Sequence, residues 1–470
     1  MIETKELNID GVLQTARKQA NKKQTPAFVS ITEQIEELDP LAFFNTGKYL
    51  GLTRTFWTNT DRSIYFVGVG NAYTMQAINQ PYTTIKQQWQ ELINDAIIDN
   101  PYPNSSAGPI VLGGFPFDQA NEKDPSLWKG GFEGSQFRLP RFMLTKDKEK
   151  YYFTINVFVE PNSNTSQLEQ QLQIESQQLL NGKEMITYTN AIHLQHEVDP
   201  EQWKDLVQKV TNDISEGKVD KIVLARELQI ELKDNCDLTE VLRNLLIMQP
   251  NSYVFAWEKN NACFIGATPE RLVQVNKKQL FSTCLAGTAP RGKDKKDDDV
   301  IGQALLQDEK NQKEHQFVVD MIRGAVTSCA RKVHIPDKPI LYPLKNLQHL
   351  YTPVQAELKR GHTILDVVAK LHPTPALSGY PSETSLSFIR EFETLERGWY
   401  GAPIGWMDDQ FNGGEFAVAI RSALVRENKV SLFAGCGVVE DSDPEQEYKE
   451  TSIKFTPPML QALGGHYELS

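Results

Sequence analysis

The stretch from residue 413 to residue 455 places the strongest restriction on how this chain can fold. Residues 416–425 and 429–433 are short runs of apolar and β-branched side chains, and the tripeptide between them suits a hairpin turn. Gly435 and Gly437 then interrupt the second strand, which lets backbone N–H groups approach a ligand closely, an anion being one candidate. The pattern predicts two strands that lead into a helix, with Arg421 on the first strand.

The residues that follow carry the signals of a helix start. Asp443, which a proline follows, is suited to the N-cap, and Gln446 stands where a capping box has Glu or Gln. Glu447, Glu450 and Lys454 are then spaced by three and four residues, so two carboxylates and an ammonium share one helix face. Such a face is commonly ordinary solvated surface, and a binding site is the alternative.

Composition limits the class of protein. A chain of 470 residues has room for two or three average domains, and a net charge of −12 argues against a nucleic-acid partner and fits an enzyme that binds an anion through a few local cations. The amino-terminal residues are acidic, and no apolar run reaches the length of a membrane span, so we expect a cytoplasmic protein with no membrane partner. Five scattered cysteines without a CxxC pair indicate reduced core thiols.

Two parts of the chain differ in motif content. Residues 1–200 contain strand-like pieces such as 64–68 among polar helical segments, and they carry few motifs. From residue 201 to 465 the pattern sharpens: Lys221 opens a strongly apolar strand, and residues 298–332 have the apolar spacing of one long helix. We therefore divide the chain near residue 200 into an amino-terminal part of the fold and a catalytic region.

The carboxy-terminal stretch closely resembles the signature of the chorismate-utilising enzymes, the family of the anthranilate, aminodeoxychorismate, isochorismate and salicylate synthases. The resemblance is specific over residues 203–456. It implies an α+β fold in which two large, mostly antiparallel β-sheets pack together with helices outside. It also implies Mg²⁺ as cofactor, with Glu447 and Glu450 in the metal site and Arg421 and Lys454 in the substrate pocket.

The resemblance implies a further metal ligand on the long helix. The segment KEHQFVVD is similar to the family segment that supplies a magnesium ligand, and Glu314 is the matching residue, although a glutamate on a long helix is usually solvated. Anthranilate synthases have another carboxylate three residues earlier, where this chain has Asn311. We therefore expect more water or fewer protein ligands at the metal, with Glu450 either a ligand or the neighbour of one.

Two residues are implied as catalytic. A lysine before a strand ordinarily keeps its amine in water, but the family has Lys at the position of Lys221 in isochorismate and salicylate synthases and Gln in anthranilate synthase, so Lys221 is the candidate general base. The sequence GATPERL resembles the family's GASPE, whose glutamate is the general acid and matches Glu270. From the residues alone, Glu270 would be a structural residue that starts a helix or turn. An acid role near neutral pH requires an apolar or anionic setting that raises its pKa.

Glycine-containing segments supply further candidate substrate contacts. In CLAGTAPRG, Gly287 and Thr288 match a family loop that typically ends in KGT, and Ala286 replaces its lysine. Aminodeoxychorismate synthases use that lysine as a covalent nucleophile, which this chain lacks. Gly435 and Gly437 are the corresponding candidates in the carboxy-terminal stretch.

Two more candidates come from the region between residues 347 and 381. His349 matches the family's pocket histidine near the substrate carboxylate, and the alternative is a half-buried structural histidine. The Pro- and Gly-rich segment 372–381 must be a loop, and it resembles the one that closes over the substrate ring. Ala376, with Leu377 beside it, takes a position where ammonia-using members generally have Thr.

Lys221, Ala286 and Ala376 together indicate isochorismate synthase activity, in which water replaces the ring hydroxyl of chorismate. The long amino-terminal half favours the menaquinone-pathway form; the alternatives are the siderophore-pathway form and salicylate synthase, which uses the same base and then eliminates pyruvate. A non-enzymatic or glutaminase-dependent subunit is the alternative from another class. Because no glutaminase signature with a nucleophilic cysteine occurs, we expect no glutaminase subunit. The expected small-molecule partner is chorismate, and we expect a monomer.

Overall fold

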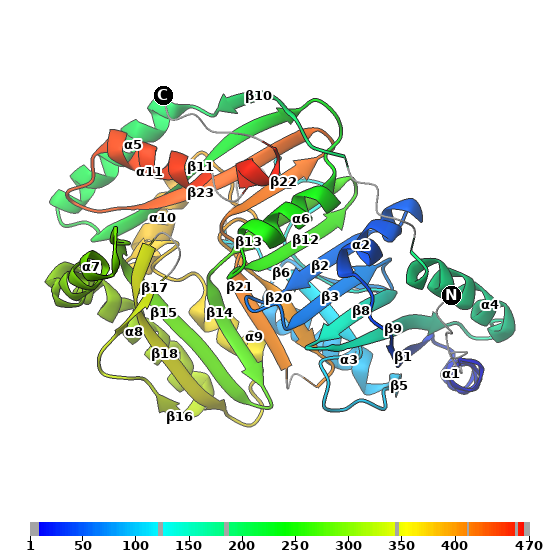
Figure 1. Ribbon diagram of the computed structural model, residues 1–470. Helices are drawn as coiled ribbons and strands as arrows, with labels where there is room; N and C mark the ends of the chain where they lie inside the picture. The colour runs from blue at the N-terminus through cyan, green and yellow to red at the C-terminus, as the bar shows by residue number, and fades with distance from the viewer. Residues whose placement is uncertain are drawn as a thin grey trace.

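The structure, a computed structural model, describes residues 9–120, 126–182, 188–343, 347–410, 413–455 and 459–464, without the side chains of Glu314 and Leu347. Two large sheets dominate it (Figure 1). Among these residues every pairing of strands is antiparallel except that of β1 with β5. The α+β prediction of two mostly antiparallel sheets with helices outside is therefore confirmed.

The 13-stranded sheet has, in spatial order, β10 (Ile192–Glu197), β11 (Lys221–Leu232), β23 (Lys429–Val438), β22 (Ser422–Arg426), β13 (Ala262–Thr268), β12 (Tyr253–Lys259), β2 (Arg54–Thr58), β3 (Ile64–Val69), β8 (Phe142–Asp147), β9 (Lys150–Val159), β1 (Ala27–Ile35) and β5 (Ile97–Asp99), with β19 (Gly379–Tyr380) paired to β11. The 10-stranded sheet has β16 (Ala330–His334), β18 (Leu347–Leu358), β15 (Gln279–Pro290), β14 (Arg271–Asn276), β21 (Gly413–Val418), β20 (Pro403–Asp408), β6 (Ile110–Gly114), β7 (Ser135–Leu139) and β4 (Tyr73–Ala77), with β17 (Ile340–Pro343) paired to β18.

The helices are α1 (Asp10–Lys23), α2 (Pro40–Tyr49), α3 (Pro81–Asn94), α4 (Thr165–Leu180), α5 (Pro200–Ser215), α6 (Leu238–Met248), α7 (Lys295–Gln307), α8 (Glu309–Cys329), α9 (Ile364–Leu371), α10 (Ser382–Phe392) and α11 (Pro444–Phe455). Figure 1 shows α5 and α11 beside each other over β11 and β23, while α8 and α9 pack on the 10-stranded sheet. In the described part of the chain, no helix combines the length and apolar character needed to cross a bilayer.

Large aromatic side chains fill the space between the sheets. Trp57 and Trp257 come from the 13-stranded sheet, Trp406 comes from β20, and Trp399 precedes β20; all four are buried. The rings of Phe66 on β3 and Trp406 lie 4.7 Å apart, which joins the two sheets directly. Because such rings each remove a large apolar area from water, this layer ties the sheets into one body.

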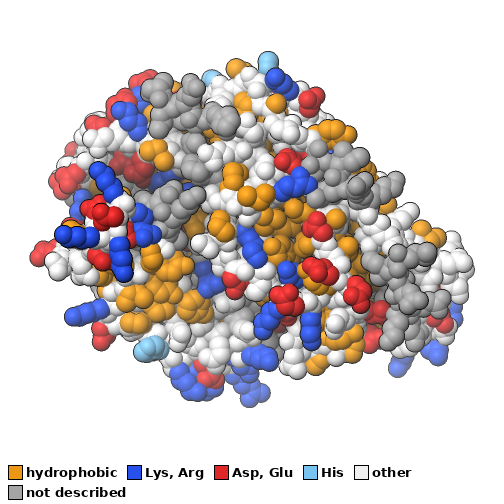
Figure 2. Space-filling view, viewed as in Figure 1, with side chains coloured by type: hydrophobic (Ala, Val, Ile, Leu, Met, Phe, Trp, Pro, Cys, Tyr) orange, Lys and Arg blue, Asp and Glu red, His pale blue; other side chains and the backbone are white. Residues whose placement is uncertain are grey.

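On the outer surface, hydrophobic side chains gather near β17 and β18, where Ile340 and Tyr342 are exposed (Figure 2).

Both sheets contain strands from either side of residue 200. In the larger sheet β12 pairs with β2, and in the smaller one β20 pairs with β6. The division near residue 200 is thus a division of motif content within sheets that the two parts share.

Three local predictions in the carboxy-terminal half are wrong. Residues 416–425 are not one strand, because the chain leaves β21 and enters β22 in the other sheet, with Arg421 between them. The predicted helix over 298–332 is two helices, since Asp308 ends α7 and caps α8 by accepting the Asn311 N–H at 2.7 Å. Gly435 and Gly437 do not interrupt β23, which continues to Val438.

Candidate active site at the seam between the sheets

Two chain segments cross between the sheets next to each other and define the seam. Residues 269–270 connect β13 to β14, and residues 419–421 connect β21 back to β22. The Val418 N–H donates to the Glu270 carbonyl oxygen at 3.0 Å, and the Ala267 N–H donates to the Arg421 carbonyl oxygen at 3.1 Å. Paired backbone bonds therefore fix the two residues beside one another.

Glu270 is half-buried and leads straight into β14, so it does not start a helix. Its own N–H donates to Thr268 Oγ1 at 3.2 Å, which holds the bend between the strands. Burial raises the pKa of the Glu270 carboxyl to about 7, and the nearby Arg421 guanidinium opposes that rise. A substantial fraction of Glu270 is therefore protonated at neutral pH, as a general acid requires.

Arg421 occupies the centre of the seam. Its φ of 52° is in the left-handed region, which is uncommon for a residue with a side chain and occurs where the surroundings enforce it. Burial lowers its pKa, while Tyr400 and Glu270 raise it; its charge in turn contributes to the lowered pKa of His349. Arg421 is therefore the cation around which Glu270, His349 and Tyr400 gather.

Lys221 lies where β11 begins, and Gly437 on the adjacent β23 makes room for its side chain. A Cβ on Gly437 would stand 2.6 Å from Lys221 Cε and 3.2 Å from Nζ. Contacts of 2.6 Å are not tolerated between carbon atoms, so the lysine could not keep this position beside any larger residue. The second glycine, Gly435, is on the same face of β23, since side chains alternate along a strand.

The loop that follows α9 packs against the start of β11. Its short strand β19 pairs with Lys221 and Ile222, and the Val223 N–H donates to the Ser378 carbonyl oxygen at 3.1 Å. Ala376 is exposed, whereas Leu377 is buried. The structure therefore brings the predicted loop beside Lys221.

The candidates on β15 and β18 lie opposite each other. Thr288 pairs with His349, and Thr288 Oγ1 is 2.9 Å from His349 Nδ1. Gly287 forms a bulge with φ of 77°, and a Cβ there would lie 3.1 Å from Asn311 Oδ1 on α8. Burial lowers the pKa of His349 and favours a neutral ring.

Helix α11 presents its charged face to the end of β23. The predicted cap is confirmed, since Asp443 Oδ1 accepts the Gln446 N–H at 2.9 Å. Lys454 Nζ donates to the Gly435 carbonyl oxygen at 3.0 Å and to Glu450 Oε1 at 2.6 Å. The Gly435 carbonyl is accessible because β22 pairs with β23 only up to Leu432. The charged face is thus directed at the sheet as well as at solvent.

Two carboxylates of α11 are the described candidates for a metal site. Glu447 Oε1 accepts the Ser442 hydroxyl at 2.6 Å, and Glu447 adds to the rise that burial causes in the pKa of the neighbouring Cys436 thiol. Glu314 lies on α8, but its side chain is outside the described part of the chain. Among described residues, no group of three or more His, Cys, Asp or Glu side chains is arranged to hold a metal. Oxygen donors of this type suit Mg²⁺, which takes few protein ligands and keeps several waters.

Sequence reasoning did not single out Tyr400, which precedes β20. Its hydroxyl would be 3.2 Å from a Cβ on Gly435, burial raises its pKa, and its charge state influences Arg421. A tyrosine in a Gly-rich stretch has no periodicity or spacing that marks it. Its contribution is visible only once the sheets are packed.

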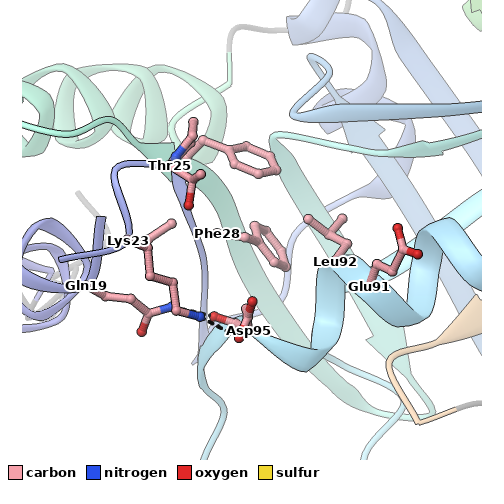
Figure 3. A pocket seen from close by; sticks show the side chains of 10 residues that line it. Gln19, Lys23, Thr25, Phe28, Glu91, Leu92 and Asp95 are labelled. Atoms are coloured by element: carbon pink, nitrogen blue, oxygen red, sulfur yellow. Dashed lines mark hydrogen bonds and ion pairs between the residues drawn. The ribbon is translucent and has the colours of Figure 1, made fainter. Parts of the chain in front are cut away.

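A small cavity of about 140 Å³ lies away from the seam, between α1, β1 and α3 (Figure 3). Lys23 and Asp95 form an ion pair of 2.6 Å across it, and Phe28 and Leu92 line it. None of the predicted site residues lines this cavity.

Comparisons with known proteins identify the family of the chain. A family model described as chorismate binding enzyme matches residues 14–464. The isochorismate synthase MenF of Bacillus subtilis (strain 168) is 41% identical over 445 residues, which cover 93% of both chains. The salicylate biosynthesis isochorismate synthase of Pseudomonas aeruginosa is 33% identical over 465 residues, 97% of this chain and 94% of that protein.

The fold is also similar to a solved structure. The menaquinone-specific isochorismate synthase MenF from Escherichia coli aligns with a TM-score of 0.78 at 23% identity, over 96% of this chain and 99% of that one. Likeness at this identity supports the fold alone. With the family model covering nearly the whole sequence, the chain belongs to the chorismate-binding enzyme family.

Proposed function

We propose that the chain is an isochorismate synthase, an isomerase that converts chorismate to isochorismate by adding water at one ring carbon as a hydroxyl leaves another. The observation that carries the proposal is full-length similarity to the Bacillus subtilis isochorismate synthase, at 41% identity over 93% of each chain. The geometry supports it, because Glu270, with a pKa of about 7, lies beside the half-buried cation Arg421 at the seam, and Lys221 lies against Gly437 on β23.

Lys221 is the proposed general base and Glu270 the proposed general acid. Water must lose a proton as it attacks, and the departing hydroxyl must gain one, so each group contributes about 10²- to 10⁴-fold in rate. The pKa of about 7 supports the role of Glu270, which can hold its proton at neutral pH and release it when the hydroxyl leaves. Gly437 supports the role of Lys221 by leaving its side chain room.

Arg421 and Lys454 are the proposed partners of the two substrate carboxylates. Arg421 offers a planar fork suited to bidentate binding, and Lys454 a compact charge held beside the Gly435 carbonyl. His349 and Thr288, which contact each other, would border the same carboxylate region. Because His349 is favoured in its neutral form, it would orient the substrate by hydrogen bonding rather than by charge.

Mg²⁺ is the proposed cofactor, held by Glu447 and Glu314, with Glu450 as a further ligand or as the neighbour of one. Glu447 and Glu450 support this by offering carboxylates one helical turn apart on α11. When bound, the metal would offset the negative charge of these carboxylates and supply Lewis-acid stabilisation to the substrate. We place the enzyme in the cytoplasm and in menaquinone biosynthesis.

An isochorismate synthase of salicylate biosynthesis is the second candidate, because the Pseudomonas aeruginosa relative of that name is similar over almost the whole chain; both candidates form isochorismate. The activity itself is tested by chromatography of the products formed from chorismate by the purified chain and Mg²⁺. Isochorismate alone supports the proposal, whereas salicylate with pyruvate would make the chain a salicylate synthase.

The role of Lys221 is tested by Lys221→Gln, with Lys429→Gln as matched control because Lys429 opens β23 as Lys221 opens β11. Loss of turnover by orders of magnitude in the first variant alone supports the proposed base. Equal turnover in both variants would remove Lys221 from the mechanism.

A further inference from the structure

One edge of β11 is incompletely covered by strands. One edge of β11 pairs with β23 continuously from Ile222 to Glu231. On the opposite, incompletely covered edge, β19 pairs only with Lys221 and Ile222, and the pairing with β10 begins at Leu228. Among the described residues, no strand pairs with the stretch from 223 to 227 on this side. Buried backbone groups there need other partners.

Side chains take the place of the missing strand. Arg397 Nη2 donates to the Val223 carbonyl oxygen at 2.7 Å, and Glu393 Oε2 accepts the Ala225 N–H at 2.8 Å. Trp203 Nε1 donates to the Ala225 carbonyl oxygen at 3.2 Å. The edge of β11 just beyond Lys221 is thus held largely by an ion pair.

The Glu393–Arg397 pair is itself almost completely buried, with exposed fractions of 2% and 3%. Its two bonds are 2.6 and 2.7 Å long, and the guanidinium lies 4.4 Å from the ring centroid of Phe117. Arg397 Nη1 also donates to the Leu377 carbonyl oxygen at 2.9 Å. One guanidinium therefore contacts both the loop that carries Ala376 and the strand that Lys221 opens.

We propose that Glu393 and Arg397 are positioning residues for the reaction. By bonding β11 and the Ala376–Leu377 loop at once, they fix the separation between Lys221 and Ala376. This inference rests on the proposed function, in which those two residues favour water as the nucleophile. A displacement of about 1 Å at a reacting group can cost about 10²-fold in rate.

The decisive variant is Arg397→Lys, which keeps the positive charge and loses the planar fork, so that one ammonium cannot reach Glu393, Val223 and Leu377 in the same geometry. Glu393→Gln is the second variant, which keeps the shape and removes the charge. The matched control is Glu258→Gln, because Glu258 binds Arg54 through bonds of 2.7 and 2.5 Å in the same sheet, between β12 and β2, and its side chain is also largely buried.

Three quantities are measured on the full chain with Mg²⁺: kcat and KM for isochorismate formation, the melting temperature, and amide hydrogen exchange of residues 376–380. We expect Arg397→Lys to lower kcat by about tenfold or more and to speed exchange in that segment, while the control loses comparable melting temperature and keeps kcat. We also expect Glu393→Gln to retain more of the wild-type kcat than Arg397→Lys does, because glutamine keeps the side-chain shape at the β11 edge.

The proposal is overturned if kcat falls in proportion to the melting temperature in all three variants, the control included. It is also overturned if Arg397→Lys leaves the amide exchange of residues 376–380 unchanged. If either pair variant fails to fold, the other supplies the comparison with the control. The exchange measurement does not depend on the identity of the base. Failure of the proposed mechanism appears instead as full turnover in Lys221→Gln.

Discussion

Replacing Glu270 with glutamine separates the acid role of this residue from its structural role. The pKa of about 7 means that the protonated form of wild-type Glu270 declines above neutral pH. If this proton goes to the leaving hydroxyl, kcat/KM falls on the alkaline side with an apparent pKa near 7. Glu270→Gln keeps the shape but has no proton to give, so we expect turnover to drop by about 10²- to 10⁴-fold with chorismate affinity little changed.

The same pKa predicts an effect on stability with a definite sign. A carboxyl whose pKa is raised from 4.5 to about 7 binds protons more tightly in the folded state. The stabilisation that this carboxyl gives the folded state is therefore fully present below about pH 4.5, and it is lost as the pH rises through about 7. One pKa unit corresponds to about 1.4 kcal/mol, so the loss in the free energy of unfolding is at most about 3 kcal/mol. Solvent contact of the half-buried side chain reduces it further. Glu270→Gln should thus gain stability relative to wild type between pH 4.5 and 8.

The assay measures kcat and kcat/KM from pH 5.5 to 9, and the free energy of unfolding in urea from about pH 2 to pH 9, which spans both pKa shifts. Glu357→Gln is the control of opposite sign, since hydrogen bonds from Lys332 and Arg331 lower the Glu357 pKa to about 2. That variant should lose stability at neutral pH and approach wild type as pH falls through the native pKa. Wild-type turnover in Glu270→Gln would refute the acid assignment, and a stability difference independent of pH would refute the raised pKa.

Three further predictions concern neighbouring residues. Gly437→Ala should lower kcat without a comparable loss in melting temperature, because its Cβ displaces the Lys221 side chain; equal kcat would show that this position of Lys221 is not needed. Glu447→Ala should weaken Mg²⁺ binding, measured by calorimetry, while circular dichroism stays native, and unchanged Mg²⁺ affinity would exclude Glu447 as a ligand. Ala376→Thr should raise the yield of aminated product when ammonium is supplied at alkaline pH, and an unchanged product ratio would separate Ala376 from nucleophile choice.

The sequence predicts the strands and helices best where periodicity and caps agree. β11 begins at Lys221 and α11 is capped by Asp443, as the patterns indicate. The apolar run of residues 416–425 predicts a single strand, because such a run carries no mark for a change of sheet. The long helix divides at Asp308, since apolar spacing continues across a break that a single capping carboxylate produces.

The candidate site is less accessible to sequence reasoning, because its geometry depends on contacts between distant segments. Motif resemblance selected Glu270 and Arg421, yet their proximity results from two crossings between sheets. Tyr400 has no distinguishing spacing, and the i,i+4 spacing of Glu393 and Arg397 is that of an ordinary helix-surface ion pair. Their significance depends on Gly435 and on the β11 edge, respectively. These are consequences of packing, which local patterns do not encode.

The most direct test of the central claim is the reaction of the purified chain with chorismate and Mg²⁺ in water enriched in ¹⁸O, followed by chromatography and mass spectrometry of the products. We expect isochorismate that carries one oxygen from the solvent, because water is the nucleophile and the original hydroxyl departs. Isochorismate without solvent oxygen, or salicylate and pyruvate as the main products, would contradict it.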